Sequence, residues 1–348
     1  MDMVLEGYFD NAFCKLNPSY LEARYKRRQL VDYLNSLIKD CVTSENCDEV
    51  TAVRHVVLAA MRYHQNSILS NGMVCNIDKC HNILYVAAKL CCDWQFNDTA
   101  TVIRLLNVMY HCEQTFERLF VGAIFGICVT RLISGWKSDF DSCAENLAAI
   151  EYFLKHATKA KLEYNNSGGG VTRFIDIPMK SYAKSQPLFL AAYFAKAEVL
   201  LLLLRYGASV VSDHETDEVS EAEPLSRFQE FCVLSLPLPQ TEIPLTCLKI
   251  LLRAVLTVAV LPSDPFSGNI RVVIGKSDCG VRRIYVHPRL LQEGVIPSSR
   301  LGLTPPELKH LSRCAIRNVL RENWQLPLGI RSLPIPLSIQ DYLDLLVD

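Results

Sequence analysis

The spacing of apolar residues predicts a mainly helical chain with one short region of strands near its C-terminal module. Residues 1–70 have helical spacing, with 20–37 and 50–63 as the main candidate helices. Farther along, the spacing changes, because two β-branched runs, 270–274 and 281–286, flank a segment with glycine at both ends. This pattern is typical of a β-hairpin.

Residues 186–210 have the pattern of two helices joined by a short turn. Pro187 favours the start of the first helix, Ala191 is small enough for close helix packing, and 199–204 forms a leucine-rich second helix. Gly207 then suits the left-handed turn that ends a helix. The segment resembles an ankyrin repeat without a gap, and a generic buried helical hairpin is the alternative.

Weaker copies of this pattern lie on both sides of the repeat. Residues 84–106 contain two helical segments separated by an insertion, 150–158 resembles a second helix, and 244–260 resembles part of a final pair. One repeat cannot bury its own apolar face, so the clear match implies stacked neighbours, in a drifted array of roughly four helical pairs. The predicted order is a helical N-terminal cap at 1–79, the array at 80–262, a hairpin-containing connector at 263–300 and a C-terminal module at 301–348.

The C-terminal module begins with a strongly one-sided helix. Thr304 as N-cap and Glu307 three residues later predict a capping box at its start. Its apolar face is formed by residues that recur every three or four positions: Leu308, Leu311, Ser312, Ala315, Ile316, Val319 and Leu320. A helix this short must bury that face, either against its own chain or against a partner.

A proline-containing segment, Leu333, Pro334, Ile335 and Pro336, follows this helix. Its alternate prolines exclude helix and central strand, and they hold an extended backbone that presents Leu333 and Ile335. Ser338 can then cap a last short helix. The segment favours burial of the preceding helix against a partner over packing within the chain.

The two segments in this order resemble a SOCS box, and together with the ankyrin-like repeat they resemble the ankyrin repeat and SOCS box family. The resemblance covers the box and residues 186–210 best. It departs from the family pattern at Ser312, where SOCS boxes usually carry a cysteine, and the nearest cysteine is Cys314. The expected fold is mainly α: a drifted ankyrin-repeat array, a small β-hairpin and a C-terminal three-helix SOCS box.

The resemblance implies a non-catalytic substrate-recognition subunit of a ubiquitin ligase. Elongin B/C would bind the helix, and cullin-5, carrying a RING-box protein, would bind the proline segment, while the repeats would hold a substrate protein of unknown identity. The alternative is an ankyrin-type interaction scaffold that recruits no ligase. The implied contact residues are Leu308, Leu311, Ser312, Ala315 and Ile316 for elongin, and Leu333, Pro334, Ile335 and Pro336 for the cullin.

Composition narrows the classes of partner. The chain has 348 residues, of which 50% are hydrophobic, so a sizeable core is expected. Its 36 basic and 37 acidic residues give no electrostatic reason to bind nucleic acid or a membrane surface. The N-terminus lacks the pattern of a signal peptide, and the most apolar stretch contains Lys196 and Glu198, which disfavours a membrane span. The 14 cysteines are therefore expected to be reduced, mostly buried thiols of a cytoplasmic or nuclear protein.

Signatures of catalysis and of metal binding are weak. The chain contains no GxSxG, HExxH or paired-carboxylate motif, so no catalytic residue and no cofactor is expected. The densest group of metal-binding residue types is Cys75, Cys80, His81, Cys91 and Cys92. It has no CxxC pair, and two adjacent cysteines suit a tetrahedral zinc site poorly. The sequence therefore predicts buried thiols here and no metal site.

Overall fold

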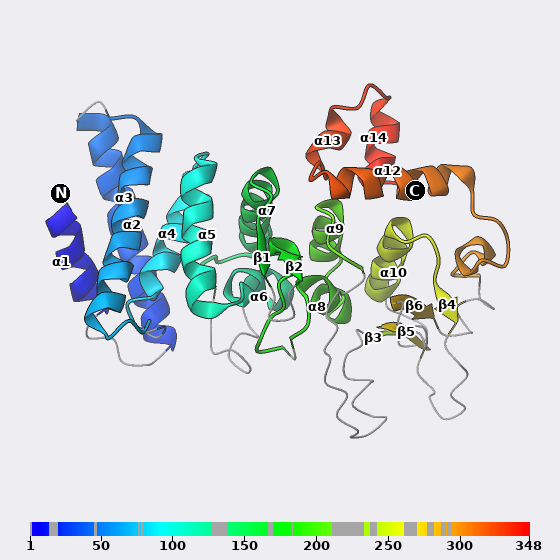
Figure 1. The fold of residues 1–348 in the computed structure, drawn as a ribbon, viewed down its shortest axis with the longest axis horizontal. Coiled ribbons are helices and arrows are strands. Elements are labelled where there is room, and N and C mark those ends of the chain that lie inside the picture. The colour runs from blue at the N-terminus through cyan, green and yellow to red at the C-terminus, as the bar shows by residue number, and fades with distance from the viewer. Residues whose placement is uncertain are drawn as a thin grey trace, which may run out of the picture. The chain divides into compact units, whose positions relative to one another are not determined.

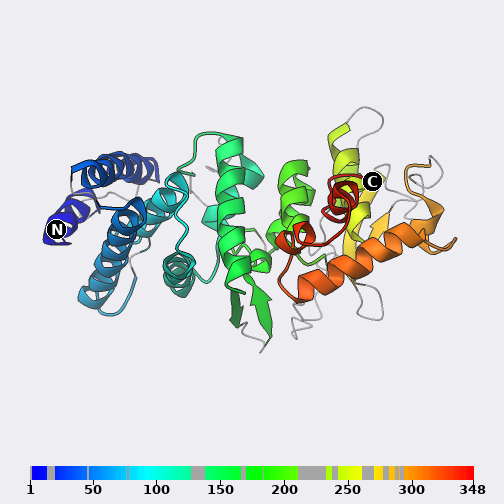
Figure 2. The same ribbon diagram turned by 90° about the horizontal axis from the view of Figure 1, so that it is seen from above.

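The computed structural model divides the chain into two compact units, Met1–Leu162 (unit 1) and Glu163–Asp348 (unit 2). Both units are mainly helical, as predicted (Figure 1, Figure 2). The boundary falls inside the segment to which the sequence assigned the array, and the four sequence-based domain limits stay predictions. The structure describes residues 2–13, 20–44, 47–75, 77, 79–126, 138–165, 170–182, 184–210, 233–236, 242–260, 270–276, 282–286, 290 and 294–348.

Seven helices make up the described part of unit 1. They are α1 (Asp2–Phe13), α2 (Tyr20–Ser44), α3 (Glu49–Ser70), α4 (Asn82–Asp93), α5 (Thr99–Glu113), α6 (Glu117–Phe125) and α7 (Cys143–Lys159). The two helices predicted at 20–37 and 50–63 are confirmed and extend farther, as α2 and α3. Helix α3 packs against α2, α4 and α5, and α6 packs against α7. The core of the unit lies between these helices, where nearly every side chain of α4 is buried.

Short polar side chains set the starts of two of these helices. Asp48 accepts a hydrogen bond from the Thr51 amide (2.9 Å) at the start of α3, and Asp98 accepts one from the Thr101 amide (3.3 Å) at the start of α5. Each satisfies a backbone N–H that has no partner inside the helix. The local sequence therefore fixes where α3 and α5 begin.

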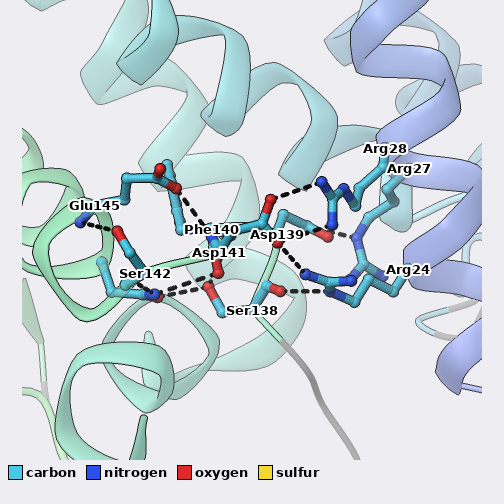
Figure 3. Close-up of polar contacts among 10 residues, drawn as sticks. Arg24, Arg27, Arg28, Ser138, Asp139, Phe140, Asp141, Ser142 and Glu145 are labelled. Atoms are coloured by element: carbon cyan, nitrogen blue, oxygen red, sulfur yellow. Dashed lines mark hydrogen bonds and ion pairs between the residues drawn. The ribbon is translucent and has the colours of Figure 1, made fainter. Parts of the chain in front are cut away.

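A group of arginines on α2 holds the segment that leads into α7 (Figure 3). The Arg27 side chain is fully buried; its Nε donates to Asp139 Oδ2 (2.7 Å) and its Nη1 to Asn82 Oδ1 (2.7 Å). Arg28 donates two hydrogen bonds to the Asp141 carboxylate, of 2.8 and 2.6 Å, and the Arg24 Nε donates to the Ser138 carbonyl (2.7 Å). Because a buried guanidinium without its carboxylate is costly, this group fixes residues 138–141 against α2.

Unit 2 mixes helices with two small sheets. Strands β1 (Glu163–Asn165) and β2 (Val171–Arg173) form an antiparallel hairpin. The second sheet has the order β3-β5-β6-β4, in which β5 and β6 are antiparallel and β4 runs parallel to β6. The remaining elements are α8 (Pro187–Tyr193), α9 (Ala197–Arg205), β3 (Val233–Leu236), α10 (Glu242–Ala254), β4 (Ala259–Val260), β5 (Ile270–Lys276), β6 (Arg282–Val286), α12 (Leu308–Glu322), α13 (Leu328–Arg331) and α14 (Leu337–Leu343), with 3-10 turns at Phe174–Asp176 and Ser298–Leu301.

The predicted β-hairpin is confirmed as β5 and β6, although it belongs to a four-stranded sheet rather than standing alone. The expectation that 244–260 is part of a final helical pair is wrong at its end, because Ala259 and Val260 form a strand beside β6. The rest of the segment contributes to α10, which packs against α9 and β3.

The helical pair predicted at 186–210 is present as α8 and α9. Pro187 lies at the start of α8, and the apolar side chains of α9 are almost completely buried. Gly207 has a φ of 80°, and a Cβ there would lie 3.2 Å from Arg321 Cγ and from Leu326 Cδ1. The glycine therefore supplies both the left-handed turn and the space for α12 to pass closely. The two helices of each pair α4–α5, α6–α7 and α8–α9 pack against each other, and the ankyrin assignment stays a prediction.

All ten described cysteines are free thiols, and only three of them, Cys91, Cys92 and Cys247, are buried. The expectation that most thiols are buried is therefore wrong for this part of the chain. No helix among the described residues is long and apolar enough to cross a membrane.

Candidate functional site

The C-terminal module contains three helices around a small core of its own. Leu326, Ile330, Tyr342 and Leu343 are buried together. Helix α14 packs on both α12 and α13 (Figure 1). The predicted three helices are thus confirmed, and the short α13 lies between α12 and the proline segment.

Helix α12 turns its polar side inward. His310, Arg313 and Arg317 are its buried residues. The Arg317 Nη2 donates to the Leu204 carbonyl (2.6 Å) and its Nη1 to the Leu343 carbonyl (2.8 Å). Burial lowers the pKa of Arg317 to about 10, so the guanidinium keeps its charge at neutral pH.

These inward side chains reach the C-terminal ends of two other helices. Arg321 Nε donates to the Gly207 carbonyl (2.9 Å), just past the end of α9, and His310 lies 2.9 Å from the Val255 carbonyl, just past α10. The last carbonyls of a helix lack partners within it and carry partial negative charge. Donors from α12 therefore cap α9 and α10, which explains why basic residues rather than apolar ones occupy the inward side.

Ion pairs fix the end of the chain to the same helices. Arg205 makes two contacts with the buried Asp344 carboxylate, of 3.1 and 2.8 Å. Arg253 donates to both carboxylate oxygens of Asp348, each at 2.9 Å, and to the Leu345 carbonyl. Sequence reasoning did not single out these two arginines. The available signal is their position in the last turns of α9 and α10, where basic residues are common.

The outward side of α12 is apolar and exposed. All five residues that the sequence assigned to elongin binding lie on it: Leu308, Leu311, Ser312, Ala315 and Ile316. The Leu308 side chain is 78% exposed, and Val319, farther along the same side, is 57% exposed. We call Leu308, Leu311, Ser312, Ala315, Ile316 and Val319 the outer face of α12. Cys314 is not part of it, because its Sγ is half-buried 3.4 Å from His310 Nε2.

The starts of two helices differ from the prediction. Helix α12 begins at Leu308 with Glu307 at the N-cap, so Thr304 does not cap it. The reason is Pro306, which disfavours helical backbone at the residue before it and delays the helix. Helix α14 begins at Leu337 after Pro336, so the expected cap Ser338 lies inside the helix.

The proline segment is not extended as predicted but bent at residues 333–335, because the Ile335 amide donates to the Leu333 carbonyl (2.8 Å). Its residues divide into supporting and exposed ones. Leu333 and Ile335 are half-buried against the small core of the module, and Gln340 Nε2 donates to both of their carbonyls at 3.2 Å. Pro334 and Pro336 are exposed. Of the four residues that the sequence assigned to the cullin, the two prolines are therefore the ones with most of their surface open to a partner.

Comparison with known proteins identifies this module. The SOCS box family matches residues 304–344, which include α12, α13 and α14. No ankyrin-repeat family matches, and no match was found among curated proteins or solved structures. Residues 304–344 are a SOCS box, the adaptor motif that joins its carrier to elongin B/C and a cullin.

Proposed function

We propose that this protein is the substrate-recognition subunit of an elongin B/C–cullin-5–RING ubiquitin ligase. The observation that carries the proposal is the outer face of α12. Its leucine, isoleucine and valine side chains lie at the surface although the opposite side of the same helix is buried. Removing an apolar strip of this kind from water lowers the free energy, so binding of a partner that covers it is favourable. The occupant we propose is elongin C, the partner that a SOCS box recruits.

The attachment of the box suits a receptor. Arg317 and Arg321 on α12, and the Arg205–Asp344 pair, connect the box to the end of α9 through buried or half-buried contacts. A surface of unit 2 that holds a target would therefore keep a fixed orientation relative to the ligase. The protein's contribution is proximity, which raises the concentration of target lysines near the loaded conjugating enzyme. It transfers nothing itself.

The choice of cullin rests on the proline segment. Pro334 and Pro336 are exposed, and their rings fix φ at two positions of the bent segment between α13 and α14. A backbone whose dihedral angles are already restricted loses less conformational entropy when it docks. The Leu-Pro-Ile-Pro order resembles the cullin-5 variant of the box. The helical pairs of both units support membership of the ankyrin repeat and SOCS box family.

The direct test is capture of elongin B/C by the purified full-length chain. Leu308→Arg places a charge in the middle of an apolar contact and is expected to weaken binding by about 100-fold or more in calorimetry. Val171→Arg is the matched control, because it adds the same charge at an exposed apolar residue of β2. It is expected to bind elongin B/C like the wild type. Unchanged binding by Leu308→Arg would instead favour an interaction scaffold that recruits no ligase.

The cullin step has a separate test in the same system. Pro334→Ala is expected to leave elongin B/C bound and to weaken recovery of cullin-5 by roughly two- to five-fold, the size of a proline's entropic effect. It is preferred to a change at Leu333, because Leu333 also supports the core of the box. Recovery of cullin-2 alone by the wild-type chain would contradict the proposed cullin.

A further inference from the structure

Four side chains of unit 1 converge on one point although they are far apart in the sequence. His64 lies in the last turns of α3, Cys75 in the connection that follows, His81 at the N-cap of α4 and Cys112 in the last turn of α5. These three helices lie side by side (Figure 1). The nitrogen and sulfur atoms that the four residues offer all lie within 4.8 Å of one another.

The distances are those of a tetrahedral metal site. His64 Nε2 lies 3.2 Å from Cys75 Sγ and 3.7 Å from Cys112 Sγ, and His81 Nδ1 lies 3.3 Å from both Cys75 Sγ and His64 Nε2. Ligands bound tetrahedrally to zinc, at about 2.3 Å for sulfur and about 2.0–2.1 Å for nitrogen, are separated by about 3.3–3.8 Å. Four of the six distances among the donors are therefore close to the spacing that one zinc ion requires, and all six are within 4.8 Å.

Residues around the group support His81 as a ligand. Its other ring nitrogen, Nε2, lies 2.6 Å from Glu113 Oε1, which also accepts a hydrogen bond of 2.6 Å from Tyr85. When the Nε2 proton is donated to this carboxylate, Nδ1 of the neutral ring presents its lone pair to the other three donors. A carboxylate behind a histidine is the usual support of a metal-bound imidazole. Arg118 Nη1, 3.6 Å from Glu113 Oε1, offsets the charge of the carboxylate.

The types of donor in the group indicate which metal ion it would bind. Two thiolates and two imidazoles in a closed tetrahedral set are typical of structural Zn²⁺, and the two thiolate charges neutralise those of the ion. Both histidines are buried and both cysteines half-buried, so the site has little surface through which a substrate could reach the metal. The set therefore suits a structural role rather than a catalytic one.

We propose that His64, Cys75, His81 and Cys112 bind one zinc ion that ties α3, α4 and α5 together. The sequence predicted no metal here because the ligand spacing, ten, five and thirty intervening residues, matches no short motif. Cys75 and His81 belonged to the candidate group, whereas His64 and Cys112 did not. Cys91 and Cys92 are buried in α4, outside the set.

The test is metal analysis of the full-length chain purified without chelators. We expect about one equivalent of zinc per chain by mass spectrometry of the metal. Cys112→Ser and His64→Gln are each expected to lose most of it. Cys80→Ser is the matched control: this thiol is close in sequence and in space to the set but contributes no ligand, so the variant is expected to keep its zinc.

A second measurement uses the wild-type chain, so that it does not depend on whether the variants fold. Replacement of zinc by Co²⁺ is expected to give the intense visible bands of a tetrahedral cobalt site with thiolate charge transfer, and removal of metal by a chelator is expected to lower the melting temperature. The proposal is overturned if the wild-type chain takes up neither metal, if the Cys112→Ser variant keeps its zinc, or if Cys75 and Cys112 form a disulfide in the wild-type chain.

Discussion

Helix α9 buries its apolar residues, whereas helix α12 buries its polar side. In α9, Leu200 and Leu203 are completely buried, and Arg205 at its end reaches out to the Asp344 carboxylate. In α12, the polar residues His310 and Arg317 are buried, while Leu308 and Leu311 are exposed. An amphipathic pattern therefore identifies which residues share a face, but not which face the chain itself covers.

The difference has a physical cause in what each helix packs against. Helix α9 lies between α8 and α10, whose facing sides are apolar, so burial of its leucines is favourable. Helix α12 instead passes the carbonyl ends of α9 and α10. These carbonyls have no partner within their own helix, so hydrogen-bond donors on α12 stabilise the contact. Polar residues therefore face inward on α12, and its apolar residues remain for a partner.

Truncation of one leucine in each helix gives the largest expected contrast. Leu203→Ala removes completely buried methyl groups and is expected to lower the free energy of unfolding by about 2–5 kcal/mol. Leu308→Ala removes an exposed side chain and is expected to change it by no more than about 0.5 kcal/mol. Hydrogen exchange of the α8 and α9 amides in the full-length chain measures both. Equal effects of the two changes would mean that the outer face of α12 is covered by its own chain.

Much of the fold could be predicted from the sequence because it follows from local patterns. The α8–α9 pair, the β5–β6 hairpin and the helix of the box all have apolar spacing or turn residues within one short stretch. The prediction was wrong where a nearby proline or a distant strand decided the outcome. Pro306 moved the start of α12, and pairing with β6 turned Ala259 and Val260 into a strand.

The sites differ in how far the sequence revealed them. The outer face of α12 lies within one helix, so its members could be named from spacing alone. The partners of Arg317 and the set around His81 come from segments far apart in the chain, and only the folded structure brings them together. Periodicity contains no information about such long-range convergence, which explains why both features were missed.

The stability of the fold is expected to depend on pH through His310 on the inward side of α12, whereas α9 contains no histidine. Burial lowers the pKa of His310 from 6.5 to about 4; the bond to the Val255 carbonyl opposes this effect, and Arg300 and Arg313 reinforce it. The folded state therefore holds a neutral ring, while the unfolded chain binds a proton below about pH 6.5. Stability due to this residue is complete above that pH and is lost progressively as the pH falls toward about 4.

A difference measurement isolates this contribution from the many carboxyl groups that titrate in the same range. His310→Gln keeps a donor and an acceptor but does not titrate, so its stability relative to the wild type is expected to improve as the pH falls from about 7 to about 5. Melting temperatures of both proteins over this range give the comparison. A constant difference between them would show that the ring is not kept neutral by its surroundings.

The smallest expected effect concerns Ser312, which stands where SOCS boxes usually carry a cysteine. Ser312 lies on the outer face of α12, whereas Cys314 is half-buried beside His310, so under the proposed function Ser312 is the one of the two expected to contact elongin C. Ser312→Cys replaces a hydroxyl, which is costly to bury without a hydrogen bond, by a less polar thiol. Affinity for elongin B/C is expected to hold or to increase by up to about ten-fold, about 1.4 kcal/mol, in calorimetry. Cys314→Ser is the control and should leave this affinity unchanged. A clear loss of affinity in Ser312→Cys would mean that Ser312 does not stand where SOCS boxes carry their cysteine.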